Sequence, residues 1–388
     1  MQLLRAPLED WLRDRYFTAE IDISSSGVQS FSMAELRQAT GLSHETIDNL
    51  VFDDGYSLGT PEVRTAIARR WGDGNPEKVM TTSGSSEAVS LVLMALIKPG
   101  DEIIVMQPGY HLLVEFARAL GCQLKTLALD EDNNWAVSLD NLADLVTPRT
   151  RAIIVNFPHN PTGASVHWDD MRTLLQHADR VGAYVLWDAA FADLVYDSGP
   201  LPDVSACYER GISFGTFSKA FGLPGLRFGW CLAPPDVLAE CVRIRDYTTL
   251  HLSPLVELLA LRVLEHADVF LEPRLKQARL NRSILAEWAY SVSDRVSLTL
   301  PAGGVAGFPR LAGFADTEDF CQQLFLQHGV LVIPGGCFGY PRHIRLGFGG
   351  PTDELVSGLD RLTTALSADF RGAGLATPAY AGRFRGDN

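Results

Sequence analysis

Short apolar runs alternate with helical patterns along much of the chain, beginning near residue 79. Apolar runs of this length, separated by amphipathic segments, are typical of strands and helices that alternate in a mainly parallel α/β sheet. A helix is predicted over residues 86–97, because Lys98, Pro99 and Gly100 follow as a stop signal. The pattern predicts seven strands, at residues 79–82, 102–106, 123–127, 152–157, 184–188, 212–216 and 228–232.

The pattern changes beyond about residue 270, where a long Arg-rich amphipathic helix is predicted. It leads to predicted strands at residues 296–300, 306–309, 330–333 and 343–346, which indicate a smaller α+β domain. We therefore expect four parts. They are an N-terminal arm (1–40) that packs with the small domain, a large α/β domain (41–270), the small domain (271–371) and a disordered tail rich in Gly, Ala and Pro (372–388).

Composition excludes several classes of function. The net charge of −14 argues against a nucleic-acid partner, because phosphodiester chains repel an acidic surface. The sequence has no run of eighteen apolar residues and no signal-peptide pattern at its start, so we expect a cytoplasmic protein without a membrane span. The six cysteines lack CxxC spacing and His-rich neighbours, which predicts free thiols and no metal site.

The clearest chemical signal lies between Ser213 and Gly229. A predicted strand ends there in small hydroxyl residues, followed by Lys219, a Gly/Pro-rich turn and Arg227 eight positions later. A lysine held at a strand end near cations has a depressed pKa, which suits it to form a Schiff base. Thr216 and Arg227 suit one phosphate group, as a hydroxyl donor and a two-pronged cation. The alternative is a surface-loop lysine, but Lys219 is the only one of the five lysines in such a context.

Two loops after predicted strands could hold the rest of such a cofactor. Residues 82–87 lie between a strand and a helix, so their amides offer an anion site at a helix N-terminus. A simple helix cap is an equal alternative for these residues. Residues 156–163 follow another strand, and Asn160 can donate to a phenolic oxygen of the cofactor.

Asp188 and Tyr110 complete the set. Asp188 ends a predicted strand in apolar surroundings, where a carboxylate needs a charged partner such as a protonated pyridine nitrogen. Tyr110 lies just past another strand end, where an aromatic ring could stack on the pyridine. Plain loop packing explains Tyr110 equally well.

Together these segments resemble the class I/II aminotransferases of the fold-type-I pyridoxal-phosphate enzymes, in the same order from about residue 20 to 365. The resemblance implies bound pyridoxal 5′-phosphate and a homodimer with active sites at its interface. It implies that Ser85, Ser86, Thr216 and Arg227 bind the phosphate, and that Tyr110 stacks on the ring. Asn160 would contact O3′ of the cofactor and Asp188 its ring nitrogen N1. Lys219 would form the Schiff base and transfer protons, and Arg345 would bind the α-carboxylate of the substrate.

Two positions depart from the family pattern. Phe191 replaces a tyrosine whose hydroxyl contacts O3′, so we expect the lysine–cofactor linkage to keep its proton to higher pH. Asp54 stands where a tyrosine usually reaches the phosphate of the neighbouring subunit, although nearby Tyr56 is an alternative for that role. An exposed acidic turn is an equal interpretation of Asp54.

Segments outside the cofactor motifs, namely 6–13, 22–28, 155–161 and 243–247, resemble the capreomycidine synthases, pyridoxal-phosphate cyclases of viomycin- and streptothricin-type pathways. The reaction implied converts (3S)-3-hydroxy-L-arginine into (2S,3R)-capreomycidine by loss of the β-hydroxyl and addition of a guanidine nitrogen. Substrate contacts are then expected from Ser25, Gly27, Asp54 and Arg345, with Asp54 binding the guanidinium across the dimer interface. The alternative is an aminotransferase that acts on a basic or aromatic amino acid. A transcription regulator is disfavoured, because it needs an added DNA-binding module, whereas only about eighty residues precede the phosphate loop and their net charge is acidic.

Overall fold

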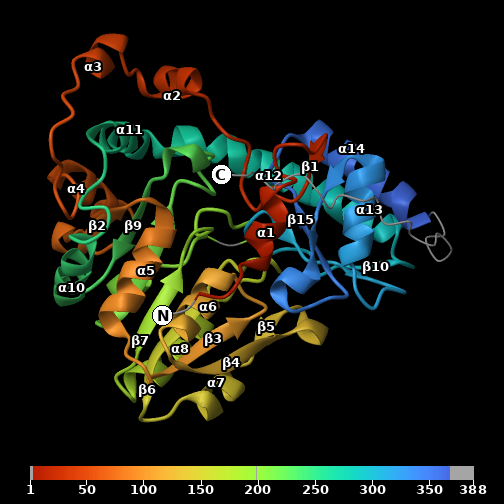
Figure 1. Cartoon of the computed structure of the whole chain (residues 1–388), viewed down its shortest axis with the longest axis horizontal. Coiled ribbons are helices and arrows are strands. Elements are labelled where there is room, and N and C mark those ends of the chain that lie inside the picture. The colour runs from red at the N-terminus through yellow and green to blue at the C-terminus, as the bar shows by residue number, and fades with distance from the viewer. Residues whose placement is uncertain (1–2, 198, 368–388) are drawn as a thin grey trace, which may run out of the picture.

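An eight-stranded sheet forms the centre of the large part of the molecule (Figure 1). The computed structural model describes residues 3–197 and 199–367. The strand order is β2-β9-β8-β7-β6-β3-β4-β5, in which only β9 and β5 run against the others. The strands are β2 (Val79–Thr82), β3 (Glu102–Gln107), β4 (Gln123–Asp130), β5 (Ala136–Val137), β6 (Thr150–Asn156), β7 (Tyr184–Asp188), β8 (Gly211–Thr216) and β9 (Gly229–Leu232).

All seven predicted strands are present, and the mainly parallel α/β class is confirmed. The prediction of seven strands was one short. The eighth, β5, is two residues long and pairs with the edge strand β4, so it leaves no periodic pattern in the sequence. The predicted helix at 86–97 is α5, which begins two residues earlier than predicted.

Helices cover both faces of this sheet, because alternate strand residues point to opposite sides. Ile103 and Val105 pack in one core, whereas Ile104 and Met106 pack in the other. On the first face lie α5 (Gly84–Leu96), α6 (His111–Ala119) and α10 (Pro235–Arg245). On the second lie α7 (Leu139–Leu145), α8 (Trp168–Asp179) and α9 (Val204–Cys207).

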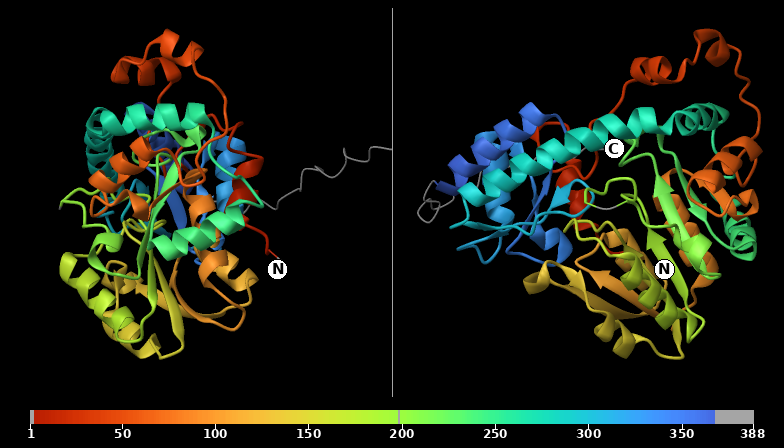
Figure 2. Two further views of the ribbon diagram at one scale, coloured as in Figure 1. Left: turned by 90° about the vertical axis from the view of Figure 1, so that its left-hand side faces the viewer. Right: turned by 180° about the vertical axis from the view of Figure 1, so that it is seen from behind.

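A smaller α+β part lies beside the large sheet, as the pattern change near residue 270 predicts. The helix α12 (Ala267–Ser291) runs from the region of α11 (Pro254–Glu265) to this smaller part (Figure 2). The smaller part contains the antiparallel sheet β11-β15-β14 (Ala306–Gly307, Ile344–Gly347, Ile333–Pro334) and the strand pair β10 and β12 (Val296–Ser297, Arg310–Leu311). It also contains the helices α13 (Glu318–His328) and α14 (Thr352–Ser367). The predicted strand 330–333 is divided between β13 (Val330–Leu331) and β14, which pair with different strands.

The N-terminal segment joins the smaller part along two strands. After α1 (Pro7–Arg13), β1 (Ile21–Asp22) pairs in parallel with β13, and the amide of Gly347 donates to the carbonyl of Ile23 at 2.9 Å. A Cβ atom on Gly347 would lie 1.8 Å from the carbonyl oxygen of Ser25, so only glycine permits this close approach. The segment is thereby fixed against β15.

Three further helices, α2 (Met33–Thr40), α3 (His44–Asp48) and α4 (Pro61–Arg70), follow the N-terminal segment. Of these, α2 and α4 both contact α11. No helix within residues 3–197 and 199–367 has the length and apolar character needed to cross a bilayer. The tail expected over 372–388 lies outside the described residues.

Candidate active site

A cavity of about 620 Å³ opens where the carboxyl ends of β7 and β8 meet β15 and the N-terminal segment. Ligand sites in open α/β sheets lie at such strand ends. All but one of the predicted site residues line this cavity: Ser25, Gly27, Ser85, Ser86, Tyr110, Asn160, Asp188, Phe191, Thr216, Lys219, Arg227 and Arg345. The exception is Asp54.

Lys219 follows β8, and its amine donates to the hydroxyl of Ser26 at 2.9 Å. Removal of the amine from water lowers the pKa of Lys219 to about 8, and repulsion from Arg345 and Arg227 acts in the same direction. The amine also lies 5.7 Å from the ring centre of Phe191, which is buried. A lysine with this pKa is partly neutral near physiological pH, as a nucleophile or a general base must be.

Asp188 ends β7 and is only 8% exposed. Burial raises the pKa of its carboxyl group to about 6, although the amide of Ala190 donates to it at 3.0 Å and the charge of Lys219 opposes the shift. Asp188 forms no ion pair with any residue that the structure describes. A buried carboxylate without a cation fits a ligand that carries a proton on a ring nitrogen.

Asn160 is held by a neighbouring asparagine. The side-chain amide of Asn156 donates to the carbonyl of Asp188 at 2.9 Å, and its oxygen accepts from the amide of Asn160, also at 2.9 Å. His159, the residue before Asn160, forms hydrogen bonds with the hydroxyl of Thr162 and the carbonyl of Pro108, both at 2.8 Å. These bonds fix the loop after β6 so that Asn160 faces the cavity.

The cationic end of the cavity brings together α5 and the turn after β8. Gly84, the first residue of α5, has φ +71°, and a Cβ atom there would lie 2.4 Å from Nη2 of Arg227. Arg227 donates to the hydroxyl of Ser218 at 3.2 Å and to the carbonyl of Pro224 at 3.0 Å. Both acceptors are neutral, so the guanidinium keeps its charge available for an anion beside the first turn of α5.

Arg345 lies on β15 and is 3% exposed. Its guanidinium donates to the side-chain oxygen of Asn160 at 3.2 Å and to the carbonyl of Ser24 at 2.9 Å, while its Nε has no partner. Burial lowers its pKa to about 10. A buried, unneutralised guanidinium with an unused donor fits a carboxylate ligand.

Sequence reasoning missed two groups in this cavity. Ser26 accepts a hydrogen bond from the amine of Lys219, and Glu9 accepts one from the hydroxyl of Tyr110 at 3.4 Å. Burial raises the pKa of Tyr110. Ser26 lies between Ser25 and Gly27, two residues that were expected to contact the substrate. Nothing in the sequence near Glu9 marks it as a site residue, because it enters the cavity only through the packing of α1.

Asp54 lies outside the cavity. Its side chain is fully exposed, and its carboxylate contacts Nε2 of His251 at 3.3 Å. Tyr56, the alternative, is 63% exposed. Within one chain, neither residue meets the groups around Lys219.

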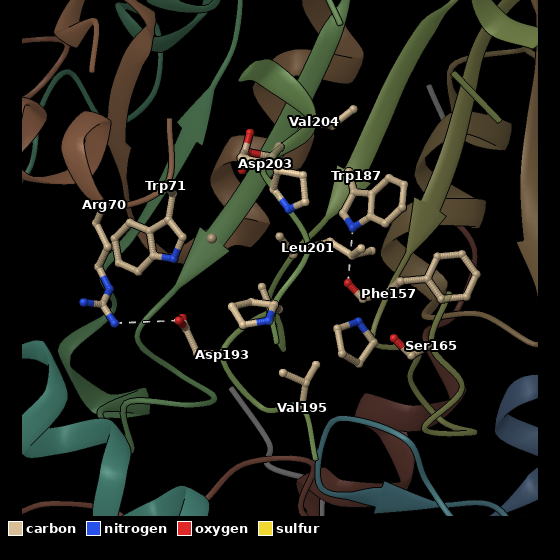
Figure 3. Close-up of a pocket in the computed structure, with 18 of the residues that line it drawn as sticks. Arg70, Trp71, Phe157, Ser165, Trp187, Asp193, Val195, Leu201, Asp203 and Val204 are labelled. Carbon is tan, nitrogen blue, oxygen red and sulfur yellow. Dashed lines mark hydrogen bonds and ion pairs between the residues drawn. The ribbon is translucent and has the colours of Figure 1, made fainter. Parts of the chain in front are cut away.

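A second, smaller cavity of about 290 Å³ lies behind the loop that follows Asp188 (Figure 3). Trp71, Trp187 and Trp230 line it, and Arg70 approaches Asp193 at 3.8 Å near its edge. A Cβ atom on Gly215 would lie 2.1 Å from the ring of Trp230, so the strand that carries Thr216 packs directly on this wall. The aromatic wall therefore supports the strand ends of the active site.

Comparison with known proteins places this geometry in context. The family model Aminotransferase class I and II matches residues 48–362. The chain is similar to the capreomycidine synthase of Streptomyces vinaceus, with 47% identity over 369 residues and 95% of each chain covered. It is also similar to an aspartate aminotransferase of Pyrococcus horikoshii, with 26% identity over 82% of this chain and 85% of the relative.

Solved structures agree with these sequence matches. The crystal structure of the PLP-dependent cyclase OrfR has a TM-score of 0.90 and 40% identity, covering 94% of this chain and 98% of that one. A PLP-dependent aminotransferase from Streptococcus suis has the same TM-score at 31% identity and the same coverage.

Proposed function

Because the chain belongs to the class I and II aminotransferase family of fold-type-I pyridoxal-phosphate enzymes, we propose that it is a cyclase that converts (3S)-3-hydroxy-L-arginine into (2S,3R)-capreomycidine in antibiotic biosynthesis. The observation that carries this proposal is the 47% identity with a capreomycidine synthase over 95% of both chains. The reaction removes one molecule of water. The bond from Cβ to the hydroxyl oxygen breaks, a guanidine nitrogen bonds to Cβ, and the proton that this nitrogen loses balances the departing hydroxyl to give water.

The cavity fits pyridoxal 5′-phosphate as cofactor. Arg227, Ser85, Ser86 and Thr216 would hold the phosphate, and the buried carboxylate of Asp188 would pair with the ring nitrogen. Asn160 would contact the phenolic oxygen, Tyr110 and Phe191 would pack on the ring, and Lys219 would form the covalent linkage. When bound, the cofactor supplies an electron sink that makes the Cα proton of an amino acid acidic.

The residues of this chain supply positioning and proton transfer. Arg345 binds the substrate α-carboxylate, with Ser25 and Gly27 beside it in the cavity wall. Lys219, with a pKa of about 8, removes the proton from Cα, donates a proton to the departing hydroxyl and later returns one to Cα. Ser26 orients the lysine amine between these tasks.

We also propose a cytoplasmic homodimer with shared active sites, built from the arm (1–40), the large domain (41–270) and the small domain (271–371). Exposed large apolar side chains support the dimer, among them Phe52 at 71%, Tyr56 at 63% and Tyr247 at 91% exposure.

The decisive experiment is incubation of the purified protein with 3-hydroxyarginine in the absence of any keto acid. We expect a product 18 Da lighter than the substrate, because one molecule of water is lost, and NMR should identify it as capreomycidine. An aminotransferase would instead require a keto acid and would transfer the amino group to it. A product that appears only when a keto acid is added would replace the cyclase with that alternative.

A further inference from the structure

Three carboxylates line the active-site cavity outside the cofactor contacts: Glu9 on α1, Asp22 on β1 and Glu354 on α14. Two of them are engaged in the fold. Asp22 accepts from the amide of Ser24 at 2.8 Å and from its hydroxyl at 2.5 Å, and Glu354 accepts from the amide of Asp22 at 3.0 Å. These bonds tie the N-terminal segment to α14.

Glu9 is the least engaged of the three. Its hydrogen bond from Tyr110 is long, at 3.4 Å, and it forms no ion pair with any residue that the structure describes. The two arginines nearest to it on the arm, Arg5 and Arg13, both bind Asp10 instead, at 2.9 and 2.7 Å. Glu9 therefore presents a half-buried carboxylate with no cation.

Glu9 also lies close to the reacting end of the cavity. The charge of Glu9 raises the pKa of Lys219 and also acts on Arg345 and Tyr110, whereas Asp22 acts on Arg345. A shallower hollow, lined by Glu9, Leu12, Arg13, Tyr16 and Phe17, opens beside it. Glu9 thus lines both this hollow and the cavity that contains Lys219.

The chemistry of ring closure needs a carboxylate in this place. The new ring contains Cβ, Cγ, Cδ, Nε, Cζ and one terminal nitrogen of the substrate, so the guanidinium must fold back toward the carbon next to Cα. Cα is held near Lys219 and Arg345. A carboxylate that binds the folded guanidinium must therefore lie beside these two cations.

We propose that Glu9 binds the guanidinium of the substrate and holds it folded toward Cβ. This inference rests on the proposed function and assigns to Glu9 the role that the sequence suggested for Asp54. Glu9 offers two oxygens to a planar donor, which is the arrangement that guanidinium groups favour.

Equilibrium binding to the cofactor-loaded enzyme tests the assignment. The probes are L-arginine and L-citrulline, which have nearly the same shape, although the urea group of citrulline is neutral. Wild-type protein should bind arginine more tightly than citrulline. Glu9→Gln should weaken arginine binding about 10- to 100-fold, as expected for a lost charged hydrogen bond, and should change citrulline binding by less than about threefold.

Matched variants and the wild-type result separate the possible failures. Glu354→Gln and Asp54→Asn should keep the preference for arginine. Full preference in Glu9→Gln would overturn the role of Glu9, and its loss in Asp54→Asn or Glu354→Gln would transfer the role to that residue. If wild-type protein itself shows no preference for arginine, guanidinium recognition is absent, and the proposed function fails together with the inference.

Discussion

The hydroxyl of Ser26 accepts a hydrogen bond from the amine of Lys219 at 2.9 Å, although 193 positions separate the two residues. Ser26 belongs to the segment that runs along β15, whereas Lys219 follows β8 of the large sheet. The end of the site that holds the lysine amine is therefore assembled from both parts of the molecule.

Lys219→Ala should abolish turnover but leave some cofactor binding through the phosphate contacts. Borohydride treatment of the wild-type enzyme should attach the cofactor permanently to the peptide that contains Lys219, as peptide mass spectrometry would show. Lys276→Ala, on the exposed side of α12, is the control and should behave like wild type. A label on any other lysine would disprove the assignment.

Gly84→Ala should weaken cofactor binding by about tenfold or more. The new Cβ would lie 2.4 Å from Arg227, and alanine is strained at φ +71°. Gly225→Ala is the matched control, because nothing lies within 4 Å of a Cβ atom there. Titration of the cofactor-free proteins with pyridoxal phosphate measures both affinities. Equal affinities in the two variants would contradict the packing argument.

Asp188→Asn should stabilise the cofactor-free protein near neutral pH but weaken its binding of cofactor. Folding raises the pKa of Asp188 from 3.8 to about 6. Between pH 3.8 and about 6, the folded protein therefore binds more protons than the unfolded chain. Stability from this group is therefore lost as pH rises from about 4 to about 6, by on the order of 2–3 kcal/mol. Urea unfolding at pH 4 and pH 7 should show the advantage of the variant only at the higher pH.

Arg345→Gln should raise KM for the amino-acid substrate by roughly 10- to 100-fold, because a charged hydrogen bond to the α-carboxylate is lost. Cofactor affinity should change little. Arg361→Gln, whose guanidinium pairs with the exposed Glu20 at 2.8 Å, controls for loss of a positive charge elsewhere. A normal KM for Arg345→Gln would remove Arg345 from the substrate site.

Phe191→Tyr should lower the pH at which the absorption of the lysine-bound cofactor changes, because the resemblance implies a hydroxyl near O3′ at this position. Phe191 is 3% exposed and lies beside Lys219, so an added hydroxyl enters the site itself. Spectra recorded between pH 5 and about 10 measure the shift. A rise in this transition pH, or no change, would contradict the prediction.

The sequence predicted best those parts of the site that lie on short segments next to strands. Lys219 and Asp188 each end or follow a strand with a strong apolar pattern, so their neighbourhood could be inferred locally. Glu9 and Ser26 could not be found in this way, because the packing of α1 places Glu9, and the strand contacts of the following segment place Ser26. Such long-range pairing leaves no periodic mark in either segment.

The fold shows the same division. Strands of four or more residues in the large sheet were predicted within three residues at each end, whereas β5 and the break between β13 and β14 were not. Elements of two residues are too short to show a period, and tertiary pairing alone defines them. Asp54 was expected to bind the guanidinium because it replaces a tyrosine of the family pattern. Its side chain is fully exposed and lies outside the cavity of its own chain, so we assign that role to Glu9 instead.

The hydrogen bond between Gly347 and Ile23 also governs when the enzyme becomes complete during its synthesis. Gly347 follows Ile23 by 324 residues in the chain. At a synthesis rate of about 5–20 residues per second, Gly347 is made roughly 15–60 s after Ile23. Until β15 emerges, Ser26 has no fixed position beside Lys219, even where the large sheet has already folded. The segment that carries Ser26 is thus synthesised well before the strand that holds it, and this end of the active site forms only after β15 has left the ribosome.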